Sequence, residues 1–519
     1  MDGTMRRTLS VIAILSLTGF AVYVSLRRPH NAAPVASQTK EMPSAEIEAL
    51  RPKVAAFCGN CHANPPPESF PKDAWFAEVE QGYRFYVDSK RNDLHPPPMN
   101  EVVAYFRTLA PKEFPKTTAL PTISHSIHFT RSQVPLPPKS RHAAVSHIQS
   151  GIDLASFVSC DMVSGEVTAT SLIGTTTEQT HLASLNNPAH AVWCDLNRDG
   201  HNDLVIADLG SAAPGDHTSG RVVWLKGTGA TPPYEPHVLL DGVGRVADVQ
   251  LADFNGDGHL DLLVAEFGWR KSGRILLLSQ RPDGKAVPAF DQQILDKRHG
   301  AIHVPVADFN GDGRPDFVAL ISQEFESVEL FLNQADGQFQ RHVLFAAGDP
   351  SFGSSGIELV DLDHDSDIDV LYTNGDTLDS FYLKPTHGVH WFENEGTQPF
   401  TPHRLASLPG ATRATAVDLD DDGDLDVVAT AYLPSVIRQQ SIPQSTETLI
   451  WIEQLPHKSF ARHTLEIGSQ GHMTLHVQDC DSDGKPDLIV GNYSDQAAPV
   501  MSSATVWMNR GVSGIPETK

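Results

Sequence analysis

The sequence predicts a mainly β fold, a seven-bladed β-propeller, joined to a small all-α domain and preceded by an N-terminal transmembrane anchor. Three observations support this prediction. An acidic loop motif recurs six times, and its first residues are 53 to 61 positions apart. A cysteine motif lies upstream at residues 58–62, and an apolar run covers residues 9–26. A repeat period of this length is typical of propeller blades, each built from four strands.

The N-terminal segment, residues 1–28, carries arginines on both sides of its apolar run. The run is about long enough to cross a bilayer. No clear small-residue cleavage site follows it, which favours an uncleaved anchor over a removed signal peptide. Residues 29–43 are rich in Pro, Ala and Ser, and we expect a flexible linker there.

The next segment, residues 44–115, contains Cys58-Gly-Asn-Cys61-His62. This is the spacing for covalent haem c, with two thioethers and His62 as the proximal ligand. A CxxC pair also serves as a thiol-redox pair or as half of a zinc site, but neither needs the adjacent histidine. Together with a predicted closing helix over residues 101–109, capped by Asn100, the motif resembles class I cytochromes c.

The distal haem ligand stays open between three arrangements. The resemblance implies a methionine, and Met99 is the first candidate. His95 is the alternative and implies a lower reduction potential, and a five-coordinate haem is the third arrangement. Met99 is also open to a plain packing role.

The six acidic loops each place oxygen side chains at positions 1, 3, 5 and 9, and five of them have glycine at position 6. Several oxygen ligands in an irregular loop suit Ca²⁺ better than Mg²⁺, so we expect up to six calcium ions. The fourth loop has Ser366 at position 6, and we expect it to be the weakest site. The predicted ligands are Asp195, Asn197, Asp199 and Asp203; Asp253, Asn255, Asp257 and Asp261; Asp308, Asn310, Asp312 and Asp316; Asp361, Asp363, Asp365 and Asp369; Asp418, Asp420, Asp422 and Asp426; and Asp479, Asp481, Asp483 and Asp487.

Short apolar runs flank these loops, so each loop is predicted to join the first two strands of a blade. A third strand follows, usually with an aromatic residue, as at 222–225, and a fourth follows in most copies, as at 237–240. Over roughly residues 120 to 512 the chain resembles the FG-GAP (VCBS) repeats of integrin-type propellers. The resemblance implies calcium loops at one end of each blade.

The predicted propeller domain covers residues 116–519. Residues 142–172 repeat the strand pattern without a metal loop and are predicted to form a degenerate first blade. The last blade stops after its third strand, and we expect residues 124–130 to supply the fourth and close the ring. A closed ring leaves no exposed sheet edge.

Polar residues recur at strand ends on the face opposite the loops, and we expect them to converge on an axial mouth, a common place for a ligand. Polar strand ends that merely face solvent are the alternative. The candidates, to which His472 and His476 add, are His190, Asp208, Asp248, Glu266, His303, Asn374, Arg413 and Asn492.

The net charge is −25, and the loop carboxylates supply much of it. This acidity argues against a nucleic-acid partner. The three cysteines outside the haem motif, Cys160, Cys194 and Cys480, form no disulfide framework, and we assign them no catalytic role.

These features predict a membrane-anchored protein on the periplasmic or extracellular side, which transfers electrons between its haem and a redox partner or small-molecule ligand bound by the propeller. The sequence shows no nucleophile motif and no dinucleotide fingerprint, so enzymatic activity stays open. The alternative function is a recognition or adhesion propeller, binding protein or glycan, that carries an accessory haem.

Overall fold

The computed structural model describes residues 41–115, 125–153, 155–173, 176–231, 233–281, 285–378, 381–438, 446–468, 471–495 and 499–512. The predicted membrane anchor and most of the predicted linker lie outside these residues. At the end of the linker, the Met42 N–H donates to Thr108 Oγ1 at 3.1 Å. In the described part of the chain, no helix has both the length and the apolar character needed to cross a membrane.

The helical unit contains α2 (Ser44–Cys58), α3 (Trp75–Asp88) and α4 (Met99–Leu109), with a 3₁₀ turn at Pro67–Ser69. Its core is aromatic: the rings of Trp75 and Phe106 stack with centroids 4.0 Å apart, and both side chains are buried. The predicted Asn100 cap is wrong, since α4 already begins at Met99 with Pro98 before it and without a side-chain cap. Pro98, whose ring fixes φ at −56°, is the last residue of the extended segment before this helix.

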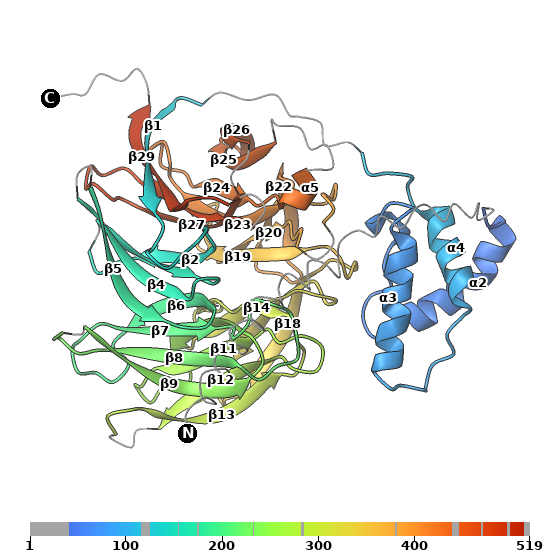
Figure 1. Cartoon of the computed structure of the whole chain (residues 1–519), viewed down its shortest axis with the longest axis horizontal. Coiled ribbons are helices and arrows are strands. Elements are labelled where there is room, and N and C mark those ends of the chain that lie inside the picture. Colours follow the sequence, from blue (N-terminus) through green and yellow to red (C-terminus); the bar gives the residue numbers. More distant parts are fainter. Residues whose placement is uncertain are drawn as a thin grey trace, which may run out of the picture.

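The propeller consists of seven antiparallel sheets (Figure 1). Blade 1 holds β2 (Val145–Ser150), β3 (Ser156–Asp161), β4 (Glu166–Ile173) and β5 (Thr176–Ser184); blade 2 β6 (Pro188–Cys194), β7 (Asp203–Asp208), β8 (Gly220–Gly227) and β9 (Tyr234–Val243); blade 3 β10 (Val246–Ala252), β11 (Asp261–Glu266), β12 (Arg274–Arg281) and β13 (Ala289–Asp296); blade 4 β14 (Ala301–His303), β15 (Val306–Ala307), β16 (Asp316–Ile321), β17 (Ser327–Asn333) and β18 (Phe339–Ala346). Blade 5 holds β19 (Ser354–Val360), β20 (Asp369–Asn374), β21 (Gly388–Glu393) and β22 (Thr401–Ser407); blade 6 β23 (Ala411–Val417), β24 (Asp426–Ala431), the short α5 (Ser435–Arg438), β25 (Glu447–Leu455) and β26 (Ser459–Ile467); blade 7 β27 (Gly471–Gln478), β28 (Asp487–Tyr493) and β29 (Ser502–Val512). The predicted seven-bladed architecture, including the degenerate first blade, is confirmed.

The ring closes through β1 (Ile127–Pro135), which pairs with β29 from Ile127 opposite Val512 to Pro135 opposite Ser502. The closure was predicted, although the strand runs further along the chain than the expected residues 124–130. Buried side chains at both ends, Ile127 and Val134, fix it against the last blade.

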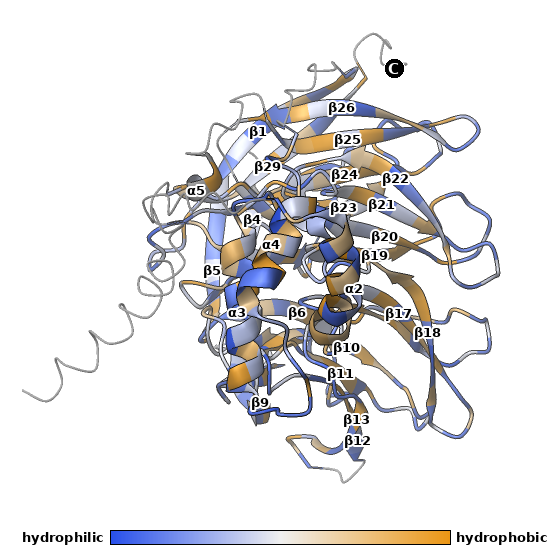
Figure 2. Cartoon of the chain, turned by 90° about the vertical axis from the view of Figure 1, so that its right-hand side faces the viewer, coloured by the Kyte–Doolittle hydropathy of each residue, from blue (hydrophilic) through white to orange (hydrophobic). Residues whose placement is uncertain are grey.

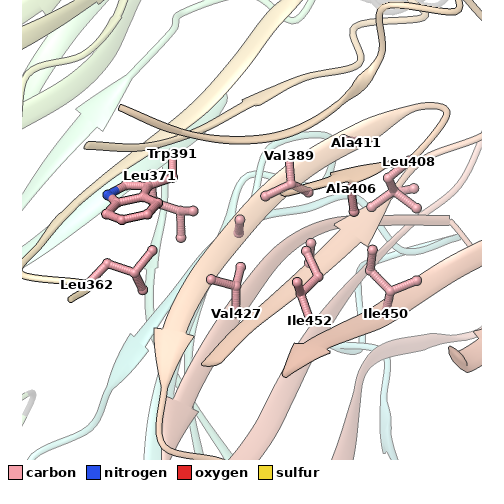
Figure 3. Packing of buried hydrophobic residues seen from close by; sticks show 13 residues of the cluster. Leu362, Leu371, Val389, Trp391, Ala406, Leu408, Ala411, Val427, Ile450 and Ile452 are labelled. Atoms are coloured by element: carbon pink, nitrogen blue, oxygen red, sulfur yellow. The ribbon is translucent and has the colours of Figure 1, made fainter. Parts of the chain in front are cut away.

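The core lies between neighbouring blades. The second strands of the loop-bearing blades are buried along their full length or all but their last residue, so they are apolar on both faces instead of alternating. Figure 3 shows Trp391 and Val389 of blade 5 in one cluster with Val427 and Ile452 of blade 6. Each buried side chain of this size contributes roughly 1.5–3 kcal/mol, so the blades stabilise one another around the ring.

Candidate functional site

The six acidic loops all join the first strand of a blade to its second strand, so they share one face of the propeller. In the first loop the Asp195 carboxylate accepts the Asp199 N–H at 3.0 Å and the Gly200 N–H at 2.9 Å. The equivalent two bonds recur in the other five loops. One local geometry is therefore repeated six times.

Three loops bring their carboxylates at positions 1, 3 and 5 together, with one oxygen of each within 4.8 Å of the others. This hard oxygen set fits a calcium ion. The remaining loops carry Asn at position 3 and offer an amide oxygen there. The three carboxylate sets are Asp361, Asp363 and Asp365; Asp418, Asp420 and Asp422; and Asp479, Asp481 and Asp483.

The aspartate at position 9 has a structural role that the sequence did not reveal. Asp203 is fully buried, and its two oxygens accept the N–H groups of Leu196 in the loop and Gly227 on the third strand, at 2.9 and 2.7 Å. The other five loops repeat both bonds. Position 9 thus fastens each loop to its blade, while each oxygen keeps a second lone pair for a cation.

The loops differ in how far basic side chains balance their charge. Asp199 has Lys226 at 3.1 Å, and Asp483 has Lys485 at 3.2 Å. Among the described residues, no base lies within ion-pair distance of the loop at 418–426. Burial and the neighbouring carboxylates raise the pKa of Asp420 in this loop to about 6. A bound cation has the most charge to compensate there.

The predicted haem motif, residues 58–62, lies where α2 ends. Cys58 is the last residue of the helix, and neither it nor Cys61 is in a disulfide. His62 Nδ1 is 2.8 Å from the Ala63 carbonyl, which can only accept, so Nδ1 carries the proton and Nε2 keeps its lone pair for a metal. Met99 is partly buried and packs against the same helical core as Cys58, whereas His95 is exposed.

The helical unit is docked on the propeller. The Ser69 hydroxyl donates to Asp349 at 2.7 Å, and Tyr382 meets Phe70 and Phe114 edge to face, with centroids 6.2 and 5.9 Å apart. The Arg270 guanidinium lies 3.1 Å from the centre of the Phe85 ring. The three propeller residues stand on loops opposite the acidic loops, in blades 3 to 5, and Figure 2 shows the helices in front of the propeller.

His62 lies within electrostatic reach of Glu324, on the loop between β16 and β17. Glu324 Oε1 lies 2.9 Å from His299 Nε2. Burial raises the pKa of Glu324, but His299, with a smaller contribution from His62, outweighs burial and holds it below its ordinary value. The helical unit that carries the cysteine motif therefore docks on the face opposite the acidic loops, where the first strands begin.

Half of the predicted axial ring comes together. The first strand of each blade contacts those of its two neighbours, so these seven strands form the inner wall of the propeller. His190 Nδ1 lies 3.0 Å and His303 Nδ1 3.8 Å from opposite oxygens of the Asp248 carboxylate. Burial raises the pKa of Asp248, but the two histidines outweigh burial and hold it well below its usual range. Arg413 stands at the same register position in blade 6.

The other half, at the ends of the second strands, does not join this ring, because each residue is paired within its own blade. Asp208 binds Arg221, and Glu266 binds Arg274 at 2.6 Å. The amide oxygens of Asn374 and Asn492 each lie 3.0 Å from a histidine, His390 and His472. These four residues have structural partners where an open ligand site was expected.

Two members of the inner ring were missed. The His147 ring lies 4.1 Å from the His190 ring, between centroids, and Glu358 lies within the electrostatic reach of Arg413. His147 was overlooked because blade 1 has no acidic loop from which to count. Strand pairing would have found it: His147 faces Cys160 as His190 faces Ala207.

The three remaining cysteines are free thiols. Cys160 and Cys480 are buried, and Cys194 is partly buried. Burial raises the pKa of Cys194 and of Cys480 to about 12, so both thiols stay protonated at neutral pH.

Comparison with known proteins supports the repeat assignment. The model of the FG-GAP-like repeat matches residues 195–264 and 308–372. Human cartilage acidic protein 1 is 23% identical over 329 residues, which cover 59% of this chain and 47% of that protein. The mouse protein of the same name is 22% identical, with 59% and 48% covered. The chain thus spans about half the length of these curated relatives.

One solved structure, an ancestral GH74 enzyme, aligns with a TM-score of 0.47 at 9% identity, covering 75% of this chain and 52% of that one. The repeat match and the seven sheets together assign the architecture: the chain carries FG-GAP-like repeats folded into a seven-bladed β-propeller.

Proposed function

We propose that this chain is a membrane-anchored c-type cytochrome, on the periplasmic or extracellular side, whose calcium-binding propeller holds the substrate or partner of its haem. The observation that carries the proposal is the docking of the helical unit, which bears the cysteine motif, on the propeller face opposite the acidic loops. A haem in a docked domain gains from a high effective concentration relative to whatever the propeller binds.

The residues around the cysteine motif fit a haem. Cys58 and Cys61 would form its thioethers, and the proton on His62 Nδ1 leaves Nε2 as the ligand atom. Met99 is the favoured distal ligand because it packs against the same helical core as Cys58, while exposed His95 is the alternative. When bound, the haem supplies one-electron chemistry. The chain supplies attachment, orientation and the neighbouring polar groups.

Calcium would hold the opposite face together. The clustered carboxylates of three loops suit a hard cation, and the loop at 418–426 has no basic partner among the described residues. The cation sites lie away from the docked helices, so we assign calcium to stability instead of to electron transfer.

The experiment that tests the proposal is a visible absorption spectrum of the whole chain, produced in a host that attaches c-type haem. We expect the α-band of a thioether-linked haem, lost in a Cys58→Ser, Cys61→Ser double variant and kept in the control Cys194→Ser. A protein without haem in that host would remove the redox function.

Substrate reduction separates the two functions of the propeller. If candidate sugars or alcohols reduce the haem, the propeller is catalytic or delivers the substrate. If the haem is present and none of them reduces it, the propeller serves recognition or adhesion, and binding to immobilised glycans and proteins becomes the next measurement.

A further inference from the structure

Arg413 is the unusual member of the inner ring. It stands on β23, and among the described residues no hydrogen-bond acceptor or acid within ion-pair distance is found for its guanidinium. By contrast, the buried acids and amides at the ends of the second strands have hydrogen-bond or ion-pair partners. A guanidinium left without an anion, yet only partly exposed, is costly unless a ligand completes it.

The Arg413 side chain reaches toward blade 5. Blade 5 has Gly356 at the equivalent position, and a Cβ atom built there would lie 3.6 Å from Arg413 Cδ, so Arg413 extends across the place of the missing side chain. Burial, and then the charge of Arg413, lower the pKa of His476 to about 4. Arg413 also lowers the pKa of His303, after burial, although His303 belongs to blade 4. Its charge therefore reaches both sides of the ring.

Further polar atoms on the inner wall lack a partner. His147 Nε2 and Gln149 Nε2, both on β2, are buried atoms without a hydrogen-bond partner in the described structure. Burial, reinforced by His190 and Arg413, holds the pKa of His147 well below its usual range, so its ring is neutral at pH 7. Water still reaches the ring, because 26% of the His303 side chain and 16% of the His190 side chain are exposed.

We infer that this inner ring binds a small molecule bearing a carboxylate, held by the Arg413 guanidinium and oriented by the neutral donors of β2. The planar guanidinium matches a carboxylate through two parallel hydrogen bonds. Asp248 lines the same ring, and its negative charge disfavours a dianion such as sulfate relative to a single carboxylate. The inference deepens the proposed function, on which it rests for its biological meaning, by naming the ligand class of the propeller.

Calorimetric titration of the full chain tests the inference with glucuronate as the probe, glucose as its neutral counterpart and sulfate as the dianion. We expect glucuronate to bind more tightly than either. Arg413→Gln should weaken glucuronate binding roughly tenfold to a hundredfold. Arg413→Lys should weaken it less, because lysine keeps the positive charge and loses only the two parallel hydrogen bonds of the guanidinium. The control Arg281→Gln, at an exposed arginine on β12, should change nothing.

Three results would overturn the inference: no glucuronate binding, equal binding of glucose, or glucuronate binding that Arg413→Gln leaves intact while its thermal unfolding matches the wild type. Among the described residues, Arg413 has no hydrogen-bond or ion-pair partner whose loss would unfold the blade, so the variant is expected to fold. The haem spectrum separates this test from that of the proposed function. If glucuronate binds through Arg413 and no haem is found, only the redox function is contradicted. If haem is found and glucuronate does not bind, only the present inference is contradicted.

Discussion

At the scale of single residues, buried acids show how environment decides charge. Glu326, at the end of the loop before β17, is 4% exposed and accepts the Ser354 N–H at 2.8 Å. Its hydrogen bonds to Ser354 and to the Gly353 backbone do not compensate for the loss of water, so burial raises the pKa of Glu326 to about 8. The folded protein therefore holds a proton on Glu326 at pH 7 that the unfolded chain releases.

This proton predicts a pH-dependent stability. The contribution of Glu326 is fully present below the ordinary pKa of 4.5 and is lost as the pH rises through about 8. Glu326→Gln mimics the protonated acid. We expect it to leave the urea midpoint unchanged at about pH 4 and to raise the free energy of unfolding by about 1–3 kcal/mol at about pH 9.

Glu178→Gln, at an exposed residue of β5, is the control for this variant and should have no effect at either pH. A Glu326→Gln variant whose stability parallels the wild type at both pH values would show that Glu326 is already ionised in the folded protein.

At the scale of the element, the acidic loop has a defined backbone conformation of its own, apart from its predicted role as a metal site. Positions 4 and 6 both adopt positive φ in every copy, as at Arg198 and Gly200 with 58° and 83°. The positive φ at position 6 could be predicted from the sequence, because only glycine adopts such angles at no cost. The positive φ at position 4 could not be predicted, because Arg, His, Asp and Ser are also found there. Ser366 takes 78° at position 6 without being glycine.

A reciprocal pair of substitutions tests this strain. Ser366→Gly should raise the free energy of unfolding by about 0.5–1 kcal/mol, and Gly313→Ser should lower it by a similar or larger amount. A Cβ atom at Gly313 meets nothing within 4 Å, so backbone conformation alone carries its cost. Urea denaturation in calcium-free buffer provides the measurement, and equal signs for the two variants would rule out the explanation.

Calcium removal tests the loops as metal sites. The second loop residue packs into the core beside a buried tryptophan, as Leu362 does with Trp391 and Leu419 with Trp451. We expect a chelator to lower the melting temperature and change the tryptophan fluorescence, and added Ca²⁺, but not Mg²⁺, to restore both. Calcium at a hundred times its dissociation constant stabilises a site by about 2.7 kcal/mol. Identical melting curves with chelator and with calcium would mean that the loops are acidic turns without a cation.

At the scale of the whole molecule, the sequence predicted what local repetition encodes. Seven blades follow from six loops at one period and a degenerate copy, and the convergence of His190, Asp248 and His303 follows from strand register. The pairing of Asp208 with Arg221 could also have been predicted from the sequence, because an arginine lies near the start of the next strand. The docking of the helices could not: Ser69 and Asp349 are 280 residues apart, and no periodicity relates them.

That docking predicts one rigid body, and Tyr382 is the residue on which it depends most. Its ring contacts Phe70 and Phe114 edge to face, and each such contact is worth about 0.5–1.5 kcal/mol beyond the buried area. We expect Tyr382→Ala to release the helical unit, which small-angle scattering would record as a larger radius of gyration and hydrogen exchange as faster exchange around Phe70.

The control is Phe76→Ala on α3, a residue that is half exposed and away from these contacts. The variant and the control should unfold at the same denaturant concentration for the propeller, since Tyr382 lies on a loop outside the blade cores. If Tyr382→Ala scatters like the wild type, the remaining contacts at Ser69 and Arg270 hold the unit without it. If release also abolishes reduction of the proposed haem by a propeller ligand, the docking of the helical unit is what couples the two domains.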